Sequence, residues 1–320
     1  MSARIIYMGT PEFAVAPLKA LLDAGFNITA VITAPDRPAG RGKKLQASAV
    51  KTFALARGIK VLQPEKLKDP LFLDVLRKLN PDLQVVVAFR MLPEQVWKLP
   101  RLGTFNLHAS LLPNYRGAAP INHAIINGEK ESGVSTFMID EKIDTGKLLF
   151  REKVTIPITY SAGDLHDILM DKGASLVVKT VKAILSGNLK ETSQDELIIG
   201  FETLHQAPKI FKEDCKINWN LEGLRIHNFI RGLSPSPTAF SFLRGIGNSE
   251  IVVKIYSATF IPGNHALPSG SIVVPDKKTL HVAVKDGYIS LLSLQLAGKN
   301  RVDVASFLNG FKDLKNFRFE

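Results

Sequence analysis

The chain has 320 residues, of which 45% are hydrophobic and 22% charged, so it has the composition of a globular protein of two domains rather than of a disordered chain. Its 41 lysine and arginine residues outweigh 30 acidic ones, and this net charge of +11 favours an anionic partner such as nucleic acid. No apolar run approaches the length of a transmembrane helix, the N-terminus lacks a signal-peptide pattern, and the single cysteine, Cys215, excludes an internal disulfide, so we expect a cytoplasmic protein that contacts no membrane.

The first half of the chain alternates short apolar runs with helical patterns. Strands are expected at Arg4–Met8, Ile28–Ile32, Leu83–Ala88, Thr104–His108 and Val134–Met138. Helices are expected at Phe13–Ala24, with Thr10 as N-cap, and at Ser48–Arg57, Ala118–Asn127 and Ala162–Leu185. The alternation predicts an α/β fold with a mostly parallel, Rossmann-like sheet that has helices on both faces.

The second half reads differently, because helical patterns become scarce after residue 186. Residues 186–208 read as a connector, and one helix is expected at Asn218–Arg231 and another at Asp303–Asn309. Strand-like runs bounded by Gly, Pro and Asn follow at Ile251–Phe260, Gly270–Val274, Leu280–Val284 and Tyr288–Leu294. This pattern predicts a small antiparallel β-barrel. We therefore expect a catalytic domain at 1–188, a linker at 189–208 and a barrel domain at 209–320.

The turn after the first strand, MGTPEF, invites comparison with dinucleotide-binding folds. Gly9 is its only glycine, and the G-x-G-x-x-G pattern that lets a pyrophosphate approach the backbone is absent. The turn still presents a helix N-terminus, which can bind a phosphate or carboxylate or serve only as a cap.

The segment at 34–51, APDRPAGRGKKLQASAVK, is long for a connection between a strand and a helix. Its basic residues outnumber its one acidic residue, Asp36, and they are Arg37, Arg41, Lys43, Lys44 and Lys51. Such a loop is either solvated or positioned to bind a polyanion at the carboxyl edge of the sheet.

Three polar side chains suggest chemistry at the same edge. Asn106 and His108 lie two apart at the end of an expected strand, so they share one face while Leu107 occupies the other. Asp144, between two strand-like runs, could fold over this edge and accept a hydrogen bond from the imidazole. An amide suited to an oxyanion, a histidine and an aspartate together suit acyl transfer without a protein nucleophile. Taken singly, each is more often an ordinary hydrogen-bonded residue.

Other candidate nucleophiles and metal ligands are weaker. Ser110 lacks the G-x-S-x-G elbow, and Cys215 lies in KEDCKI with no histidine nearby in sequence. The remaining histidines do not have the spacing of metal ligands, so no metal site is expected.

The run NLHASLLPNYRGAAP at 106–120 and the downstream IDTGKLL at 143–149 resemble the folate-dependent formyltransferases. The signature of that family is N-x-H-x-S-L-L-P-x-[FWY]-R-G-x-x-P followed by D-x-G. MGTPEFAVAPLKAL, APDRPAGRGKK, KINW, IRGLSPSPTAF and LLSLQLAGK are further similar to members that act on initiator methionyl-tRNA, so the resemblance covers essentially the whole chain.

This resemblance implies transfer of a formyl group from 10-formyltetrahydrofolate to the methionine amino group of initiator methionyl-tRNA. We expect the protein to be a monomer. It implies that Asn106, His108 and Asp144 are catalytic. The folate contacts it implies are Phe89, Leu92, Ser110, Leu111, Leu112, Pro113, Ile139 and Asp140. The tRNA contacts it implies are Arg37, Arg41, Lys43, Lys44, Lys209 and Lys212.

The segment VVVAFRMLP departs from the family, whose members read approximately VVVAYGLILP there: one residue is missing and Arg90 is present. Three other functions stay open. One is formyl transfer to a small amine, such as a nucleotide-linked amino sugar, which needs neither the basic loop nor the barrel. The others are tRNA binding by an inactive homologue, which the intact trio disfavours, and hydrolysis that releases formate.

Overall fold

The computed structural model describes residues 2–39, 44–198, 203–245, 250–311 and 314–320. The chain forms two compact units. The first consists of Met1–Gly117, Ser132–Val154 and His166–Gln206, and the second of Ala118–Glu131, Thr155–Leu165 and Ala207–Glu320. Two short segments of the first half thus pack with the second unit. The boundaries expected from the sequence, with a catalytic domain ending at 188 and a linker ending at 208, stay a prediction.

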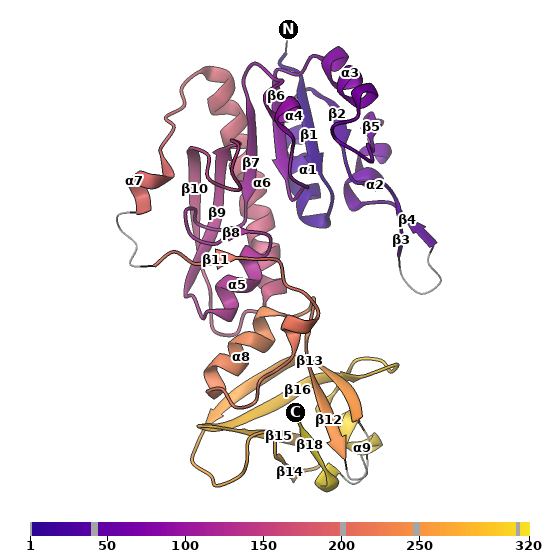
Figure 1. Cartoon of the computed structure of the whole chain (residues 1–320), viewed down its shortest axis with the longest axis vertical. Helices are drawn as coiled ribbons and strands as arrows, with labels where there is room; N and C mark the ends of the chain where they lie inside the picture. Colours follow the sequence, from indigo (N-terminus) through magenta and orange to yellow (C-terminus); the bar gives the residue numbers. More distant parts are fainter. Residues whose placement is uncertain (1, 40–43, 199–202, 246–249, 312–313) are drawn as a thin grey trace. The chain divides into compact units, whose positions relative to one another are not determined.

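The N-terminal unit is built on a seven-stranded sheet with the order β10-β9-β7-β6-β1-β2-β5 (Figure 1). Its strands are β1 (Ile5–Gly9), β2 (Ile28–Ile32), β5 (Val61–Leu62), β6 (Leu83–Val87), β7 (Thr104–His108), β9 (Glu131–Met138) and β10 (Leu148–Thr155). Each neighbouring pair in the run β5-β2-β1-β6-β7 of this sheet is parallel, and β9 pairs antiparallel with β7. The expectation of a mostly parallel, Rossmann-like sheet is confirmed.

Helices pack against both faces of this sheet. They are α1 (Val15–Asp23), α2 (Ala49–Ala56), α3 (Pro70–Leu79), α4 (Glu94–Trp97) and α6 (Ala162–Ser186). α3 and α4 contribute to a core with Ile6, Met8 and Val86. On the other face, α6 lies so close to Leu107 that a Cβ on Gly173 would come within 2.6 Å of the leucine side chain.

Helix starts follow the local capping chemistry, with one correction. Ser48 caps α2, because its hydroxyl accepts a hydrogen bond from the N–H of Lys51 at 3.0 Å. Thr10 was expected to cap the first helix and does not. That helix begins with a 3₁₀ turn, Glu12–Ala14, with Pro11 at the cap position and no side-chain cap. Proline fixes its own φ near the helical value, so the turn can start without a capping side chain.

Several short elements are not marked by any sequence pattern. The basic segment contains β3 (Arg37–Ala39) paired with β4 (Lys44–Gln46), so it is not wholly a loop. The connector contains α7 (Gln194–Ile198), and it then forms β11 (Gln206–Ala207), which pairs with β8 (Arg116–Gly117) (Figure 1). These elements are too short to carry a readable hydrophobic period, and tertiary contacts decide their structure.

The C-terminal unit is dominated by an antiparallel sheet with the order β14-β15-β16-β13-β12-β18. Its strands are β12 (Ala239–Gly245), β13 (Glu250–Pro262), β14 (Ile272–Asp276), β15 (Thr279–Val284), β16 (Gly287–Leu296), β17 (Val302–Asp303) and β18 (Phe317–Phe319). The N–H of Phe319 donates to the carbonyl of Gly270 at 2.9 Å, and Ser271 bridges to Arg318. The two edges of the sheet therefore meet, which confirms the barrel expectation.

Among the described residues of this unit, the α-helices include α5 (Pro120–Ile126), α8 (Gly223–Gly232) and α9 (Val304–Gly310), and the 3₁₀ helices include η2 (Glu213–Cys215) and η3 (Leu314–Asn316). The helix expected at Asn218–Arg231 begins only at Gly223. The residues before it form no helix: Lys216 bridges to Phe240, the N–H of Ile217 donates to the carbonyl of Phe240 in β12 at 2.8 Å, and residues 219–220 form a turn. Ile217 and Trp219 are buried in the barrel core, so tertiary packing overrides the helical pattern there.

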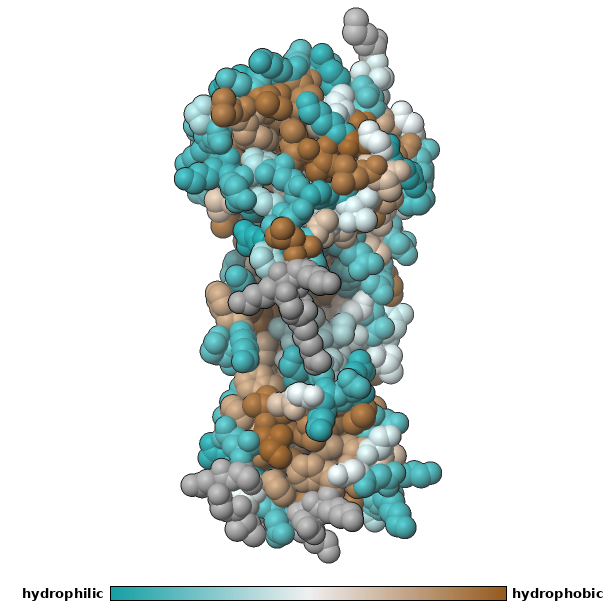
Figure 2. All heavy atoms as spheres, turned by 90° about the vertical axis from the view of Figure 1, so that its right-hand side faces the viewer, coloured by the Kyte–Doolittle hydropathy of each residue, from teal (hydrophilic) through white to brown (hydrophobic). Residues whose placement is uncertain are grey.

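The surface mixes polar and apolar side chains. Figure 2 shows hydrophobic patches among hydrophilic residues on the side of the molecule where α2, α3 and the β3–β4 hairpin lie. Exposed large apolar residues of these elements are Leu45, Leu55 and Leu71. In the part of the chain that the structure describes, no helix has both the length and the apolar character to cross a bilayer.

Candidate active site

Asn106 and His108 lie in β7, at the carboxyl end of the parallel strands, where open α/β sheets bind ligands. Their register places them on the sheet face covered by α3 and α4, because Asn106 pairs with Val86 and Leu107 points to α6 on the other face. The half-buried Asn106 side chain makes no hydrogen bond to any described residue, so its amide is available to a ligand.

His108 is 6% exposed, and one contact settles which of its ring nitrogens carries the proton. Nε2 lies 2.8 Å from the carbonyl oxygen of Tyr115. A carbonyl can only accept, so Nε2–H donates and the neutral ring leaves Nδ1 as the acceptor. The Tyr115 backbone thus fixes the tautomer, and the hydrogen bond from the imidazole to Asp144 that the sequence suggests is not formed.

Asp144 lies in the loop between β9 and β10, and the fold brings it back to β7. Its Oδ2 is 3.8 Å from Nδ1 of His108, too long for a hydrogen bond but within the range of an ion pair with a protonated ring. The same oxygen accepts from the N–H of Gly117 at 2.9 Å. The structure therefore brings all three predicted catalytic side chains to one edge of the N-terminal unit, and their catalytic roles stay a prediction.

The turn that follows β7 is held by two serines. Ser110 donates through Oγ to the carbonyl of Asn114 at 2.7 Å, and Ser135 donates to the carbonyl of Ser110 at 2.6 Å. The hydroxyl of Ser135 also accepts from the N–H of Leu112 at 3.1 Å. Ser110 is fully buried, so its hydroxyl is occupied by structural bonds and is poorly placed to act as a nucleophile.

The predicted folate residues fall into two groups by exposure. Phe89, Leu111, Ile139 and Asp140 are half-buried or exposed and can present side chains to a ligand. Leu92, Ser110, Leu112 and Pro113 are buried. Any contact of the second group is therefore expected to use backbone atoms, and the whole assignment stays a prediction.

The departure at Arg90 has a structural counterpart. Ala88, directly after β6, adopts a left-handed conformation with φ of 46°, which is unusual for a residue with a side chain. Arg90 then donates through Nη1 to the carbonyl of Glu65 at 2.8 Å and through Nη2 to the carbonyl of Pro64. The arginine thus fastens the segment after β6 to the segment after β5.

The predicted tRNA contacts are only partly described. Arg37 is exposed on β3, whereas Arg41, Lys43 and the side chain of Lys44 lie outside the described residues. Lys209 and Lys212 are exposed in the C-terminal unit, and Nζ of Lys209 lies 5.1 Å from the ring centroid of Phe211, which is 55% exposed. Lys51 is neutralised by Asp36 at 2.6 Å, and its hydrogen bond to that carboxyl is the main cause of the lowered pKa of Asp36.

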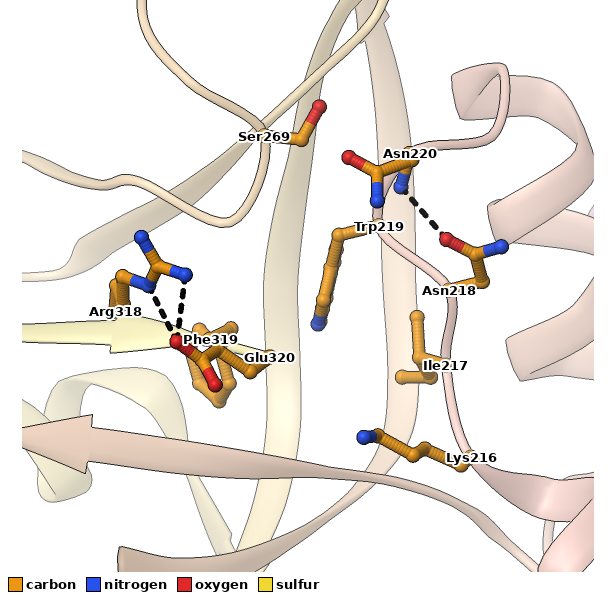
Figure 3. A pocket seen from close by; sticks show the side chains of 9 residues that line it. All are labelled: Lys216, Ile217, Asn218, Trp219, Asn220, Ser269, Arg318, Phe319 and Glu320. Carbon is orange, nitrogen blue, oxygen red and sulfur yellow. Dashed lines mark hydrogen bonds and ion pairs between the residues drawn. The ribbon is translucent and has the colours of Figure 1, made fainter. Parts of the chain in front are cut away.

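A separate pocket of about 460 Å³ lies in the C-terminal unit and contains none of the predicted site residues (Figure 3). Arg318 donates to Glu320 at 2.7 Å through Nε, and the carboxamide oxygen of Asn218 accepts from the N–H of Asn220 at 3.0 Å. Glu320 pairs with both Arg318 and Arg244, and the other polar side chains of the lining include those of Lys216, Asn218, Asn220 and Ser269.

The sequence does not mark three contributors to the site. The Tyr115 carbonyl and the Gly117 N–H lie inside the motif at 106–120, but nothing in the sequence marks these backbone groups as partners of His108 and Asp144. Gln194 bonds to the backbone of the Asp144 loop from the connector, where the sequence has no recognisable pattern. Within the described ranges, no three histidine, cysteine, aspartate or glutamate residues cluster as a metal site would need.

Two family models match the chain. A model described as "Formyl transferase" matches residues 3–181, and one described as "Formyl transferase, C-terminal domain" matches residues 209–312. Among curated proteins, a methionyl-tRNA formyltransferase of Parabacteroides distasonis is 52% identical over 98% of this chain and 97% of its own length. A protein of the same name from Flavobacterium johnsoniae is 52% identical over 96% of both chains.

Solved structures share the fold at low identity. The N-formyltransferase of Helicobacter canadensis, in complex with folinic acid and dTDP-3-aminofucose, aligns with a TM-score of 0.63 and 22% identity over 91% of this chain and 98% of its own. HypX of Aquifex aeolicus, in complex with tetrahydrofolic acid, aligns with a TM-score of 0.63 and 15% identity over 96% of this chain and 47% of its own. At these identities the comparison supports the fold alone.

Proposed function

Because the chain belongs to the formyl transferase family, we propose that it transfers the formyl group of 10-formyltetrahydrofolate to the α-amino group of methionine on initiator methionyl-tRNA. One observation carries this proposal. The chain is 52% identical to relatives named methionyl-tRNA formyltransferase, and the similarity covers nearly its full length, including the barrel domain. The arrangement of Asn106, His108 and Asp144 supports it, since the three side chains suit acyl transfer between two nitrogens.

The reaction needs one bond made and one broken. The neutral methionine amine attacks the formyl carbon, a C–N bond forms, and the carbonyl electrons move to oxygen as an oxyanion. Collapse of this tetrahedral species breaks the bond to N10 of the folate. The amine loses one proton and N10 gains one, so no covalent enzyme intermediate is required.

Asn106 and His108 are assigned to stabilise the oxyanion by hydrogen bonds. The amide of Asn106 has no competing partner among the described residues, so it can donate to the developing charge without breaking another bond. In His108 only Nδ1 is available, because Nε2–H is bonded to Tyr115. The donor role therefore requires the protonated ring, and the neutral ring instead accepts a proton at Nδ1.

Asp144 is assigned to proton movement and to holding the charge on His108. Its Oδ2 accepts only one hydrogen bond from the described protein, from Gly117, and it faces Nδ1 of His108. A carboxylate there stabilises the imidazolium and can accept from the attacking amine. The proton lost by the amine can then pass to N10 through this pair.

The basic residues Arg37, Arg41, Lys43, Lys44, Lys209 and Lys212 are proposed to contact tRNA phosphates. Four of them lie in the 37–46 segment, and Lys209 and Lys212 lie in the C-terminal unit. We also propose that the protein acts as a monomer in the cytoplasm, where initiator tRNA is charged; size-exclusion chromatography with light scattering tests the first point.

The test is formyl transfer from labelled 10-formyltetrahydrofolate to three acceptors: methionyl initiator tRNA, a nucleotide-linked amino sugar, and water alone. We expect label to appear on the aminoacyl group of the tRNA and nowhere else at a comparable rate. Faster transfer to the amino sugar, or release of formate at the same rate without acceptor, would replace the proposal by one of the alternatives.

A further inference from the structure

We propose that Gln194, in the segment that connects the sheet to the barrel, is a positioning residue that holds Asp144 in its catalytic place. This inference rests on the proposed formyl transfer. It assigns to the connector a part in building the active site, although the sequence suggests only a link between domains.

The carboxamide of Gln194 is fully used by the loop that carries Asp144 and by Arg116. Nε2 donates to the backbone carbonyls of Asp144 at 2.9 Å and Gly146 at 2.8 Å. Oε1 accepts from Nε of Arg116 at 3.1 Å and from Nη2 at 2.6 Å. These four contacts fill the capacity of an amide, and a flipped amide would place like groups against one another.

The contacts close into a ring around Asp144. Gln194 holds the backbone of Asp144, and its other end holds the side chain of Arg116. The next residue, Gly117, donates its N–H to the carboxylate of Asp144. Backbone and carboxylate of the aspartate are therefore fixed through one amide group and one short strand, β8, which sets the direction in which the free face of the carboxylate points.

Asp144 needs this support because its backbone is strained. Its φ is 55°, in the left-handed region, which residues with a side chain adopt only rarely, although aspartate tolerates it better than most. The connector is anchored beside it, because Leu148 and Thr192 exchange two backbone hydrogen bonds of 2.8 and 2.9 Å. Lys147 and Glu191 add an ion pair at 2.9 Å. Gln194 thus contacts the Asp144 loop from a segment that is itself bonded to residues 147 and 148.

Gln194 acts through Asp144 and not by touching a substrate. Its side chain is 2% exposed and has no unused donor. Loss of its amide should let the loop relax toward an unstrained conformation and move the carboxylate away from Nδ1 of His108. Misplacement of a reacting group by about 1 Å can reduce turnover by up to roughly 10²-fold.

The test compares Gln194→Met, which keeps the length and removes every bond, with Gln194→Glu, which keeps oxygen acceptors for Arg116 but removes the donor to the Asp144 loop. We expect kcat to fall about tenfold or more in both, with KM for folate and tRNA within about twofold of the wild type. Circular dichroism and the melting temperature show whether each variant is folded. Gln295→Met in the barrel is the matched control. The amide of Gln295 also uses both its oxygen and its nitrogen in hydrogen bonds, to Tyr256 and Lys299, and its loss should leave kcat unchanged.

Repeating Gln194→Met and Gln194→Glu in an Asp144→Asn background separates positioning from general destabilisation. If Gln194 acts through the carboxylate, each should lower the residual kcat less than twofold further. Wild-type kcat in Gln194→Glu, or equal fold-losses in both backgrounds, would overturn the inference. Absence of methionyl-tRNA formylation by the wild type would instead overturn the proposed function, so the two failures are distinguishable.

Discussion

Asn106 and His108 lie two residues apart on one face of β7, yet what each already touches gives them different tasks. Asn106 has no protein partner among the described residues, whereas His108 has one nitrogen committed to the Tyr115 carbonyl. The NH₂ group of Asn106 can therefore donate to an oxyanion without first breaking another hydrogen bond, and His108 can change its protonation only at Nδ1.

Replacing Asn106 by alanine should lower kcat by roughly 10²–10³-fold, because one oxyanion donor is lost. KM for folate should change little, since the ground-state carbonyl needs the donor less than the transition state does. Steady-state formylation kinetics measure both values. A variant that loses affinity for folate but keeps its kcat would show that Asn106 binds the ground state instead.

At the residue scale, the sequence predicts which side chains share a face of a strand. It does not predict contacts between residues that lie far apart in the chain. The pairing of Asn106 with His108 follows from alternation along one strand. The hydrogen bonds of Gln194 join residues 48 to 78 positions apart in the chain, and no local pattern encodes them. Tyr115 and Gly117 act through backbone groups, so their side chains carry no signal of the role.

At the scale of elements, short segments between the strands build the site. β3 and β4 pair antiparallel, so the basic segment is a hairpin in which Arg37 lies opposite Gln46. The sequence predicts the positive charge of this segment but not the hairpin, because its strands are only three residues long. This pairing places Arg37 opposite Gln46 within the hairpin, beside the basic residues that follow it in the sequence.

Arg37→Ala and Arg41→Ala should each raise KM for methionyl-tRNA about three- to tenfold while the Kd of folate stays the same, because phosphate contacts act independently of the folate site. Kinetics with varied tRNA and fluorescence titration of folate provide the measurements. Arg77→Ala, at an exposed ion pair on α3, is the matched control and should change neither value. Equal losses for both ligands would remove the segment from tRNA binding.

Asp82 joins the starts of three elements, because its carboxylate accepts from the N–H of Arg4 at 2.8 Å and from Nε of Arg101 at 2.8 Å. The Arg4 backbone bond first, and then the Arg101 bond, lower the pKa of Asp82 to about 2. A lowered pKa means that the unfolded chain binds the proton more tightly, so the bonds stabilise the fold above about pH 4 and are lost as the pH falls toward 2.

Asp82→Asn should therefore reduce stability most at neutral pH, and its difference from the wild type should shrink as the pH falls from about 4 to 2. Urea unfolding at a series of pH values measures this difference. Asp74→Asn, at an exposed ion pair on α3, is the control and should change stability little at any pH. A constant deficit for Asp82→Asn across the acid range would show that the charge of its carboxylate is not what stabilises the fold.

At the scale of the whole molecule, the sequence predicts both architectures because their patterns differ in kind. Buried runs such as LQVVV alternate with helical patterns in the first half, whereas short strands between turn residues fill the second. It does not predict that residues 118–131 and 155–165 pack with the C-terminal unit. That grouping depends on contacts such as the bond from Asn122 to the carbonyl of Gly232, 110 residues away.

The net charge of +11 is spread over both halves of the chain, so tRNA affinity should fall steeply with salt. If about four phosphates are neutralised, raising KCl from about 50 to 200 mM should weaken Kd for tRNA on the order of 10²-fold. Filter binding at four salt concentrations gives the slope. A Kd that is insensitive to salt would mean that the basic residues do not contact the phosphates.

The role of Asp144 is tested by a single-turnover measurement of formyl transfer to methionyl initiator tRNA by the wild type and by Asp144→Ala, at saturating folate and tRNA. We expect a rate constant at least about 10²-fold lower in the variant, with circular dichroism unchanged, because the group that faces Nδ1 of His108 is gone. A rate near that of the wild type would contradict it, since the side chains joined at the edge of β7 would then not be carrying out the transfer.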